Sequence, residues 1–319
     1  MKQPTWGLVS TIRADTRDIL NFAAHHLDLG AHRVHIYLDA PNETAQAALR
    51  AHPKCRVTLC DDDYWRRRGK RPDKHQPRQT INATRCYNRR PQVDWLAHID
   101  VDEFLWPEAS LPGQLATLPD DTFSARVRPI EALAPDPADP PDDGLTWFKA
   151  CTRMRGARMA QTPQIYPRFG ARLDGGFLSH VAGKVFVRTG HENVSLRIHN
   201  AFHDGVPDKL APEIEATRLC HLHAPSLEKW KAAFRFRLRQ GSYRDSLKPI
   251  PTPDGDGLTM NQLLSGIEAE GGESALDAFY HEVCVATPDL RERLHMFGLL
   301  RAARLELDTK RARHFPRHA

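Results

Sequence analysis

The chain has 319 residues, of which 40% are hydrophobic and 27% are charged, and its formal net charge is +5. This composition excludes disordered and fibrous proteins, and the length is sufficient for a large buried core. The sequence contains no run of eighteen apolar residues and no apolar region near its start, so we expect neither a transmembrane helix nor a signal peptide.

Four short apolar runs in the first hundred residues predict buried β-strands, and the amphipathic segments between them predict helices. The first helix should begin at Asp15 or Thr16 and the second at Asn42, because these side chains can cap the N-terminus of a helix. The predicted strands cover residues 6–12, 33–39, 55–60 and 95–99. Strand–helix alternation of this kind predicts βαβ units and a parallel sheet in an α/β fold.

Polar or charged side chains lie where these strands end. Thr11 and Arg13 lie at the end of the first strand, Asp39 at the end of the second, Asp61 after the third and Asp100 after the fourth. Ligands of parallel sheets bind at the carboxyl ends of the strands. We therefore expect these five side chains to lie beside a ligand.

A basic segment at residues 64–77, YWRRRGKRPDKHQP, follows the third strand. It is either a solvated surface loop or a set of cations that hold phosphate groups. Pro77 is expected to open a helix, because proline is tolerated in the first turn. In that helix Arg78, Asn82 and Arg85 should lie close to one face.

The stretch DWLAHIDVDEFLW at residues 94–106 places Asp100, Asp102 and Glu103 directly after a buried strand. Crowded carboxylates repel one another, and a divalent cation would remove that cost. Alternation along a strand puts Asp100 and Asp102 on the same side. The stretch therefore predicts a metal or catalytic site, and the alternative is an acidic surface turn.

Beyond residue 110 the pattern is less regular. Strands are expected at 123–130 and 185–188, and a Pro/Asp loop at 135–143. The segment GGFLSHVAGKVFVR at 175–188 brings His180 and Lys184 together, and LCHLHA at 219–224 places His221 and His223 on one face of a strand-like piece. From residue 226 the chain is expected to be helical, with a solvated end at KRARHFPRHA.

These segments together resemble the GT-A glycosyltransferases, and within that fold the bacterial family 2-like proteins with an IDxDEF motif. The matching pieces span residues 6 to about 226: WGLVSTIRAD, HIYLD, YWRRRGKRPDKHQPRQTINA, DWLAHIDVDEFLWP, GFLSHVAGKVFVRTG and HLHAPS. The resemblance implies a Rossmann-like α/β fold, with a mixed, mostly parallel sheet flanked by helices and a helical C-terminal extension. The implied segments are a nucleotide-sugar-binding half at 1–110, an acceptor-side half at 111–225 and the extension at 226–319.

The resemblance also implies an activity. A sugar would move from a UDP- or GDP-sugar to a hydroxyl of a glycan or lipid-linked acceptor, with inversion, in bacterial surface polysaccharide or glycoconjugate synthesis. Mn²⁺ or Mg²⁺ would be the cofactor, and no nucleic acid would be a partner. Six scattered cysteines without a CxxC pair predict reduced thiols in a cytoplasmic protein. Peripheral contact with the inner membrane stays open, with FRFRLR at 234–239 as its candidate segment.

The family's site residues match positions in this chain. Its acidic residue after the second strand matches Asp39, which would touch the nucleotide. Its DxD pair matches Asp100, facing the ribose or the ion, and Asp102, binding the ion directly. Its late histidine ligand falls on LCHLHA, where we choose His221 over His223. The expected substrate-binding residues are Thr11, Arg13, Asp39, Arg78, Asp100 and Lys184, and the expected metal ligands are Asp100, Asp102 and His221.

An inverting transfer also needs a base that deprotonates the acceptor. Glu103 follows the acidic motif and His180 lies in a matching segment, so these two are the predicted catalytic residues. Glu131, Asp174 and Glu192 are further candidates. Two other functions remain open: a nucleotidyltransferase, although STIRADTRD lacks the glycines of such an enzyme's first loop, and a non-enzymatic protein that binds anionic ligands through its arginines.

Overall fold

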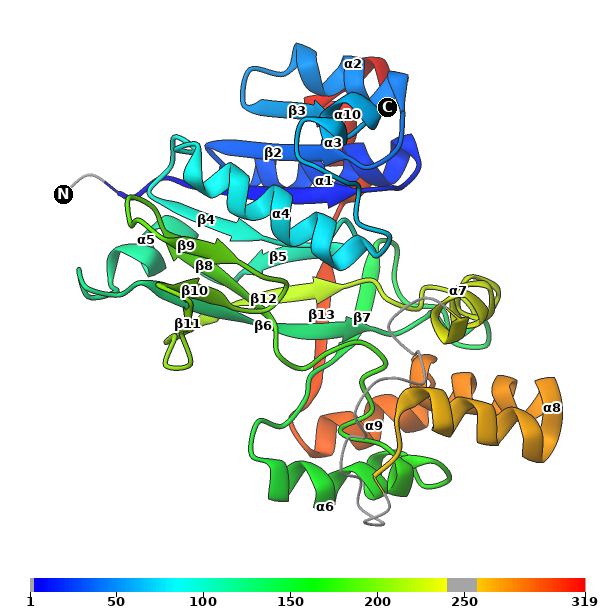
Figure 1. Ribbon diagram of the computed structural model, residues 1–319. Helices are drawn as coiled ribbons and strands as arrows, with labels where there is room; N and C mark the ends of the chain where they lie inside the picture. Colours follow the sequence, from blue (N-terminus) through cyan, green and yellow to red (C-terminus); the bar gives the residue numbers. More distant parts are fainter. Residues whose placement is uncertain (1–2, 240–256, 319) are drawn as a thin grey trace. The chain divides into compact units, whose positions relative to one another are not determined.

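The computed structural model describes residues 3–239 and 257–318 of the chain (Figure 1). The chain forms two compact units. Unit 1 comprises Met1–Pro129, Ala182–Leu219 and Glu306–Ala319, and unit 2 comprises Ile130–Val181 and Cys220–Leu305. Strands β6 and β12 each begin in unit 1 and end in unit 2.

Four parallel strands form the centre of unit 1, in the order β3-β2-β1-β4. Antiparallel strands follow, with β8 beside β4 and β6 beside β8. Helices flank this mixed sheet, which confirms the predicted Rossmann-like α/β fold. The strands are β1 (Trp6–Ile12), β2 (Arg33–Leu38), β3 (Cys55–Leu59), β4 (Trp95–His98), β6 (Ser124–Ala132) and β8 (Lys184–Arg188).

The order of the parallel strands creates a topological switch point. The chain runs from β1 outward through β2 to β3, and it then returns to the other side of β1 as β4. Open α/β sheets bind ligands outside the carboxyl ends of the strands at such a point. The residues that follow β1 and β4 therefore lie where a ligand is expected.

The first two helices of unit 1 begin where the sequence predicts. In α1 (Thr16–Asp28), Asp15 Oδ1 accepts a hydrogen bond from the Asp18 N–H at 2.8 Å. In α2 (Glu43–Ala51), Asn42 Oδ1 accepts one from the Ala45 N–H at 3.0 Å. These bonds satisfy amide groups that the first turn of a helix leaves without partners.

The prediction of a loop over residues 64–77 is wrong at both ends. Helix α3 (Asp62–Arg66) begins after Asp61, whose Oδ1 accepts a hydrogen bond from the Tyr64 N–H at 2.7 Å. Tyr64 and Trp65 are 7% and 2% exposed, so the burial of two aromatic rings stabilises a helical turn within a basic segment. Helix α4 (His75–Asn88) begins two residues before Pro77.

The other elements of unit 1 are short. Strands β9, β10 and β11 form a small antiparallel sheet, and β12 pairs with β5. The bounds are β5 (Glu103–Pro107), α5 (Leu111–Ala116), β9 (Val194–Leu196), β10 (Ala201–His203), β11 (Val206–Pro207) and β12 (Glu213–His221).

The expectation of a solvated C-terminal end is wrong. Residues 306–319 belong to unit 1, where α10 (Leu307–His314) packs on α1 and is followed by the 3₁₀ turn η2 (Pro316–His318). Arg311 Nη1 donates a hydrogen bond to Asn21 Oδ1 at 2.6 Å. Arg17 pairs with Asp308 at 2.8 Å, and Phe315 is 4% exposed. One buried ring and a polar network thus fix a segment of largely basic composition.

Unit 2 combines strands with helices. The strand β13 was not expected, because its residues, LRAAR, are good helix formers. It pairs antiparallel with β7, with Leu300 opposite Lys149, so tertiary pairing overrides helix propensity. The elements are β7 (Leu145–Lys149), α6 (Arg155–Ile165), η1 (Gly170–Arg172), α7 (Leu227–Arg239), α8 (Met260–Cys284), α9 (Pro288–Met296) and β13 (Leu300–Arg304).

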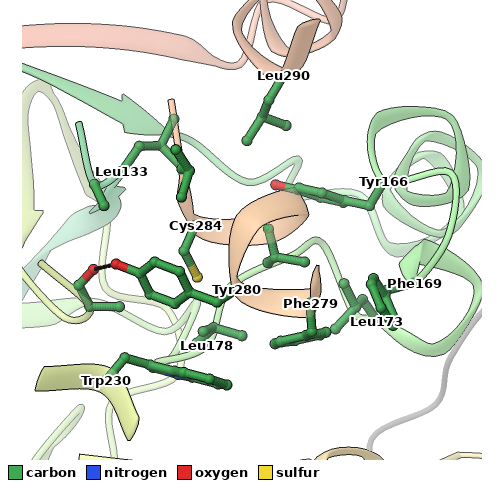
Figure 2. Close-up of a cluster of buried hydrophobic side chains, with 14 of the residues drawn as sticks. Leu133, Tyr166, Phe169, Leu173, Leu178, Trp230, Phe279, Tyr280, Cys284 and Leu290 are labelled. Carbon is green, nitrogen blue, oxygen red and sulfur yellow. Dashed lines mark hydrogen bonds between the residues drawn. The ribbon is translucent and has the colours of Figure 1, made fainter. Parts of the chain in front are cut away.

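An aromatic cluster forms the core of unit 2 (Figure 2). The ring of Trp230 stacks on Phe234 with centroids 5.5 Å apart, and the Tyr280 hydroxyl donates a hydrogen bond to the Ala224 carbonyl at 2.8 Å. Phe234 is 1% exposed. The first aromatic residue of the FRFRLR segment therefore belongs to a protein core.

Parts of the predictions lie beyond what the structure tests. The sequence also predicts a helix end at Gly241 and a loop at 249–257, and Gly241 and residues 249–256 fall outside the described residues. The division into segments 1–110, 111–225 and 226–319 stays a prediction. Among the residues that the structure describes, no helix combines the length and apolar character that crossing a membrane requires.

The buried C-terminal ring gives a stability prediction. Replacing Phe315 by Ala (F315A) should lower the free energy of unfolding by about 3 kcal/mol, because it opens a cavity in a packed site. Urea denaturation followed by circular dichroism measures this loss. The exposed neighbour Arg317 supplies the control variant R317A, which should change stability by less than about 0.5 kcal/mol. Equal midpoints for F315A and R317A would contradict the described packing.

Candidate functional site

Four predicted site residues lie at the carboxyl ends of adjacent parallel strands in unit 1. Thr11 and Arg13 lie at the end of β1, Asp39 directly follows β2, and Asp100 follows β4. The Asp39 N–H donates a hydrogen bond to the Ile12 carbonyl at 2.8 Å. The structure thus brings these residues to the switch point of the sheet.

Asp100 is held from two sides. Its Oδ2 atom lies 2.6 Å from Nζ of Lys184, and its Oδ1 atom accepts a hydrogen bond from the side-chain amide of Gln79. The Lys184 side chain is 2% exposed and that of Asp100 is 28% exposed. Lys184 reaches Asp100 because β8 runs antiparallel to β4, so the first residue of β8 lies near the end of β4. Gln79 is not among the predicted site residues, although it lies in the matching segment YWRRRGKRPDKHQPRQTINA.

Glu103 is fully buried and fixes the backbone of Asp100. Its Oε2 atom accepts a hydrogen bond from the Asp100 N–H at 2.8 Å and lies 3.3 Å from Nζ of Lys184. Burial opposes the charge of Lys184, but the carboxylates of Asp100 and Glu103 outweigh it and raise the pKa of this lysine. Glu103 therefore has the position of a residue that orients Asp100, and its role as general base stays a prediction.

The acidic turn after β4 fits a divalent cation. Strand β4 ends at His98, so Asp100 and Asp102 lie in the turn that leads to β5. The expectation that strand alternation aligns them is therefore wrong. Carboxylate oxygens suit hard cations such as Mg²⁺ and Mn²⁺, and the buried lysine beside Asp100 shows that positive charge is favourable here. Asp100 and Asp102, which is half-buried, are the side chains that would hold the ion.

Asp39 binds two arginines of the basic segment. Its Oδ2 atom accepts a hydrogen bond from Nε of Arg78 at 2.9 Å and lies 2.8 Å from Nη2, while Oδ1 accepts one from Nη2 of Arg71 at 3.0 Å. Arg78 also donates to the carbonyls of Pro72 and Asp73, at 2.8 and 2.9 Å. These bonds close the basic segment over the end of β2. The sequence predicted Asp39 and Arg78 as substrate ligands but not that they bind each other.

Thr11 belongs to a buried hydrogen-bond chain, whereas Arg13 is exposed. The side-chain amide of Asn82 donates to Thr11 Oγ1 at 3.1 Å, and its oxygen accepts a hydrogen bond from the Tyr64 hydroxyl at 2.5 Å. Asn82 is 0% exposed. This chain ties β1, α3 and α4 together beneath the switch point and leaves Arg13 as the accessible cation at the end of β1.

The predicted histidines lie in unit 2. Strand β12 ends at His221, so His223 is outside it, and the expectation of one strand carrying both is wrong at His223. The rings of His221 and His223 have centroids 5.0 Å apart, and those of His180 and His221 are 5.7 Å apart. Unit 2 thus gathers three imidazoles. The prediction that His221 shares an ion with Asp100 and Asp102 concerns residues of different units and stays a prediction.

A buried ion pair, Glu131–Lys149, supports the loop that carries His180. The Lys149 Nζ atom lies 3.1 Å from Glu131 Oε1, and both side chains are at most 1% exposed. Glu131 Oε2 accepts hydrogen bonds from the Ser179 N–H at 2.9 Å and the Ser179 hydroxyl at 2.6 Å. Sequence reasoning missed Lys149, although a lysine directly after the apolar pair 147–148 is a signal for a buried cation. Glu131 therefore positions the residue before His180.

The remaining candidate bases, Asp174 and Glu192, do not position any of the predicted site residues through the contacts described here. Asp174 Oδ1 accepts a hydrogen bond from Nε of Arg158 at 2.6 Å, and the two side chains form an ion pair. Glu192 is exposed.

Comparisons with known proteins place the chain only coarsely. No family model and no curated protein matches it. Similar solved structures include an active-site mutant of LgtC, with a TM-score of 0.27, 13% identity and 57% of each chain covered. HddC from Yersinia pseudotuberculosis has a TM-score of 0.27 and 8% identity, with 42% of this chain and 65% of that chain covered. A third is described as mannose-1-phosphate geranyltransferase from Thermus thermophilus, with a TM-score of 0.24, 10% identity, and 93% and 68% covered.

The galactosyltransferase LgtC in complex with donor and acceptor sugar analogs is also similar, with a TM-score of 0.25 and 13% identity. The chain spans 57% of the length of LgtC. At TM-scores this low the likeness carries no argument, so the activity has to be argued from the residues of the site.

The buried lysine gives a second prediction. Replacing Lys184 by Met should destabilise the protein by about 3 kcal/mol, because two carboxylates lose their buried partner. In the double variant E103Q/K184M the loss should be smaller, because one carboxylate is then neutral. Urea denaturation of K184M, of E103Q and of the double variant measures the coupling, with K70M as a control at an exposed lysine. A double variant whose loss equals the sum of the single losses would contradict the contact.

The Glu131–Lys149 pair predicts a pH dependence. Burial alone would raise the pKa of Glu131, but Lys149, His223 and hydrogen bonds from Ser179 and Leu178 lower it to about 2, from an ordinary value of 4.5. Stability from this charge is therefore complete above pH 4.5 and is lost as the pH falls toward the folded-state pKa.

The difference in the free energy of unfolding between wild type and the variant E131Q should become smaller between pH 6 and pH 3.5. We expect E131Q to be less stable than wild type by about 3 kcal/mol at pH 6 and by a smaller margin at pH 3.5. Urea midpoints at both pH values measure this, with E292Q as the control at an exposed glutamate of unit 2. A margin that grows on acidification would contradict the assignment.

Proposed function

We propose that the protein is a metal-dependent glycosyltransferase that transfers a sugar from a nucleotide-sugar donor to an acceptor hydroxyl. The observation that carries the proposal is the gathering of Asp39, Asp100 and Asp102 at the switch point of a Rossmann-like sheet, with a lysine and two arginines bound to them. Sheets of this kind bind nucleotides at this edge. Carboxylates there can hold the divalent cation that accompanies a diphosphate.

The residues of unit 1 would bind and orient the donor. Asp100 and Asp102 would hold Mn²⁺ or Mg²⁺, which when bound supplies Lewis-acid stabilisation of the departing nucleoside diphosphate. Asp39 would face the nucleoside and Arg13 the phosphates. Lys184 holds Asp100 in place and carries a positive charge toward the same turn. Membership of the family 2-like proteins with an IDxDEF motif is part of this proposal and is supported by the sequence pieces that match them.

The acceptor side would lie in unit 2. We assign the base to His180, because histidine is the side chain that most often removes a proton in catalysis and because Glu131 fixes the adjoining Ser179. Glu103 would act as a positioning residue for Asp100. His221 would be the third metal ligand. Inversion at the sugar carbon, a glycan or lipid-linked acceptor, and a role in bacterial surface polysaccharide synthesis are carried by the family resemblance.

The proposal predicts a loss of activity in D102A. With Mn²⁺ present, wild type should release nucleoside diphosphate from a UDP-sugar or a GDP-sugar, and D102A should do so about 100-fold more slowly, since a metal ligand contributes several kcal/mol. The control D62A removes an exposed aspartate of unit 1 and should keep full activity. A chelator should abolish the wild-type activity. Equal rates for D102A and D62A would reject the proposal.

The products separate the proposal from its main alternative. A glycosyltransferase releases a nucleoside diphosphate, whereas a nucleotidyltransferase consumes a nucleoside triphosphate and releases pyrophosphate. Chromatography of reactions started with each substrate class distinguishes the two. Pyrophosphate release that depends on Asp102 would keep the metal site and replace the reaction.

A further inference from the structure

A second charged site lies in unit 1, at the edge of its sheet. Strand β3 is the last strand of the sheet (Figure 1). A hollow of about 700 Å³ opens beside it, lined by residues of β2, β3, α2, α3 and α4. This volume is within the range of small-molecule sites, about 300–1,000 Å³. None of its lining residues belongs to the donor site proposed above.

Arginines dominate the lining of this hollow. Five guanidinium groups surround it: one from α2, two from α4 and its C-cap, and two from the segment that follows α3. Across residues 3–239 and 257–318, none of the five lies in an ion pair with a carboxylate. We call them the edge arginines: Arg50, Arg67, Arg68, Arg85 and Arg89.

The two acids of the lining are occupied elsewhere. Asp61 caps α3 by accepting a hydrogen bond from the Tyr64 N–H at 2.7 Å. Asp63 forms an ion pair with Arg66, which does not line the hollow, with an N···O distance of 2.7 Å. The hollow therefore keeps a positive charge that its own carboxylates do not neutralise.

Two surface arginines elsewhere in unit 1 illustrate the contrast, because each is matched with an acid. Arg17 pairs with Asp308, and Arg313 pairs with Asp28. Among the residues that the structure describes, no carboxylate pairs in this way with any of the five edge arginines. Like charges gathered around one hollow repel each other, and a bound anion would reverse that cost.

Helix ends position the edge arginines. Arg50 lies in the last turn of α2, Arg67 caps the C-terminus of α3, and Arg85 and Arg89 lie in the last turn and at the C-cap of α4. The C-terminus of a helix carries about half a negative charge. Three such ends offset part of five positive charges, so a net positive charge remains.

Arg68 is ordered before any ligand arrives. Its guanidinium carbon lies 3.5 Å from the centre of the Tyr64 ring, and its Nη1 donates a hydrogen bond to the Tyr64 carbonyl. Tyr64 packs edge-to-face on Tyr37, with ring centroids 6.3 Å apart, and both rings line the hollow. An arginine fixed in this way loses little rotamer entropy on binding.

We propose that this hollow binds a ligand that carries two or more neighbouring phosphate groups. The guanidinium fork matches phosphate oxygens in bidentate geometry, and five forks around one space exceed what a single phosphate can occupy. The ligand could be a soluble phosphate ester or the headgroup of a phospholipid, since both offer the same chemistry. The site uses neither the acidic turn nor a metal, so it is independent of the glycosyl transfer proposed above.

The test uses the full-length protein and inorganic pyrophosphate. Isothermal titration in the presence of a chelator excludes any site that needs a divalent cation. Wild type should bind one pyrophosphate per chain, and at least ten-fold more tightly than inorganic phosphate. The variant R67Q/R89Q, which removes two exposed edge arginines, should bind pyrophosphate at least ten-fold more weakly.

A matched control separates a site from general attraction. The variant R56Q/R90Q removes the same charge from two exposed arginines of unit 1 that lie outside the hollow, and it should change the affinity for pyrophosphate less than two-fold. Equal weakening in both double variants would overturn the proposal, and so would phosphate binding as tight as that of pyrophosphate.

A second arm identifies the source of the phosphates. Flotation with vesicles of phosphatidylcholine and cardiolipin, compared with phosphatidylcholine alone, tests a lipid headgroup. Binding that needs cardiolipin, is displaced by pyrophosphate and is lost in R67Q/R89Q supports the proposal with a lipid ligand. Pyrophosphate binding without flotation supports it with a soluble ligand. Absence of both would overturn it.

Discussion

The site in unit 1 depends on one buried cation placed between two carboxylates. Lys184 lies 2.6 Å from Asp100 and 3.3 Å from Glu103, with 2% of its side chain exposed. Removing an ammonium group from water is costly, and a buried ion pair gains little net stability over apolar packing. The role of Lys184 is therefore to fix the position of Asp100. Asp100 is the most exposed of these three side chains, and it lies after β4, where the sheet reverses its strand order.

The sequence predicted the location of this site but not its contacts. Strands that alternate with capped helices determine where Asp39 and Asp100 lie, because parallel strands bring their carboxyl ends to one edge. The contact of Lys184 with Asp100 joins residues that are 84 positions apart, and it depends on the antiparallel pairing of β8 with β4. No local pattern encodes that pairing. The bonds between Arg78 and Asp39 likewise depend on how the basic segment folds back over β2.

The errors of prediction share a physical cause. Basic composition suggested loops or solvated ends at residues 64–66 and 310–319, yet a few apolar rings in each, Tyr64, Trp65 and Phe315, are buried and fix the backbone. Composition averages over a segment, whereas the burial of one aromatic ring outweighs the solvation of several arginines that keep their charged groups in water. Strand β13 was missed for a related reason, because its pairing with β7 overrides the propensity of its residues.

Unit 1 handles charge in two different ways. At the switch point, the carboxylates of Asp39, Asp100 and Glu103 bind Arg71, Arg78 and Lys184, and the proposed cation would join Asp100 and Asp102. At the edge of the sheet, arginines lie in excess with their acids engaged elsewhere, so the hollow can take an anion. The same α/β framework supports both: the edge arginines lie at or near the C-terminal ends of α2, α3 and α4, whereas Asp39 and Asp100 follow the carboxyl ends of β2 and β4.

The central claim, that Asp100 and Asp102 hold a cation together with the diphosphate of a sugar donor, is tested most directly by crystals grown with Mn²⁺ and soaked with UDP or GDP. The account predicts anomalous density for manganese in contact with Asp102 and with phosphate oxygens of the nucleotide, at the carboxyl ends of β1 and β4. A nucleotide bound at this edge without the ion, or both aspartates turned away into solvent in the soaked crystal, would contradict it.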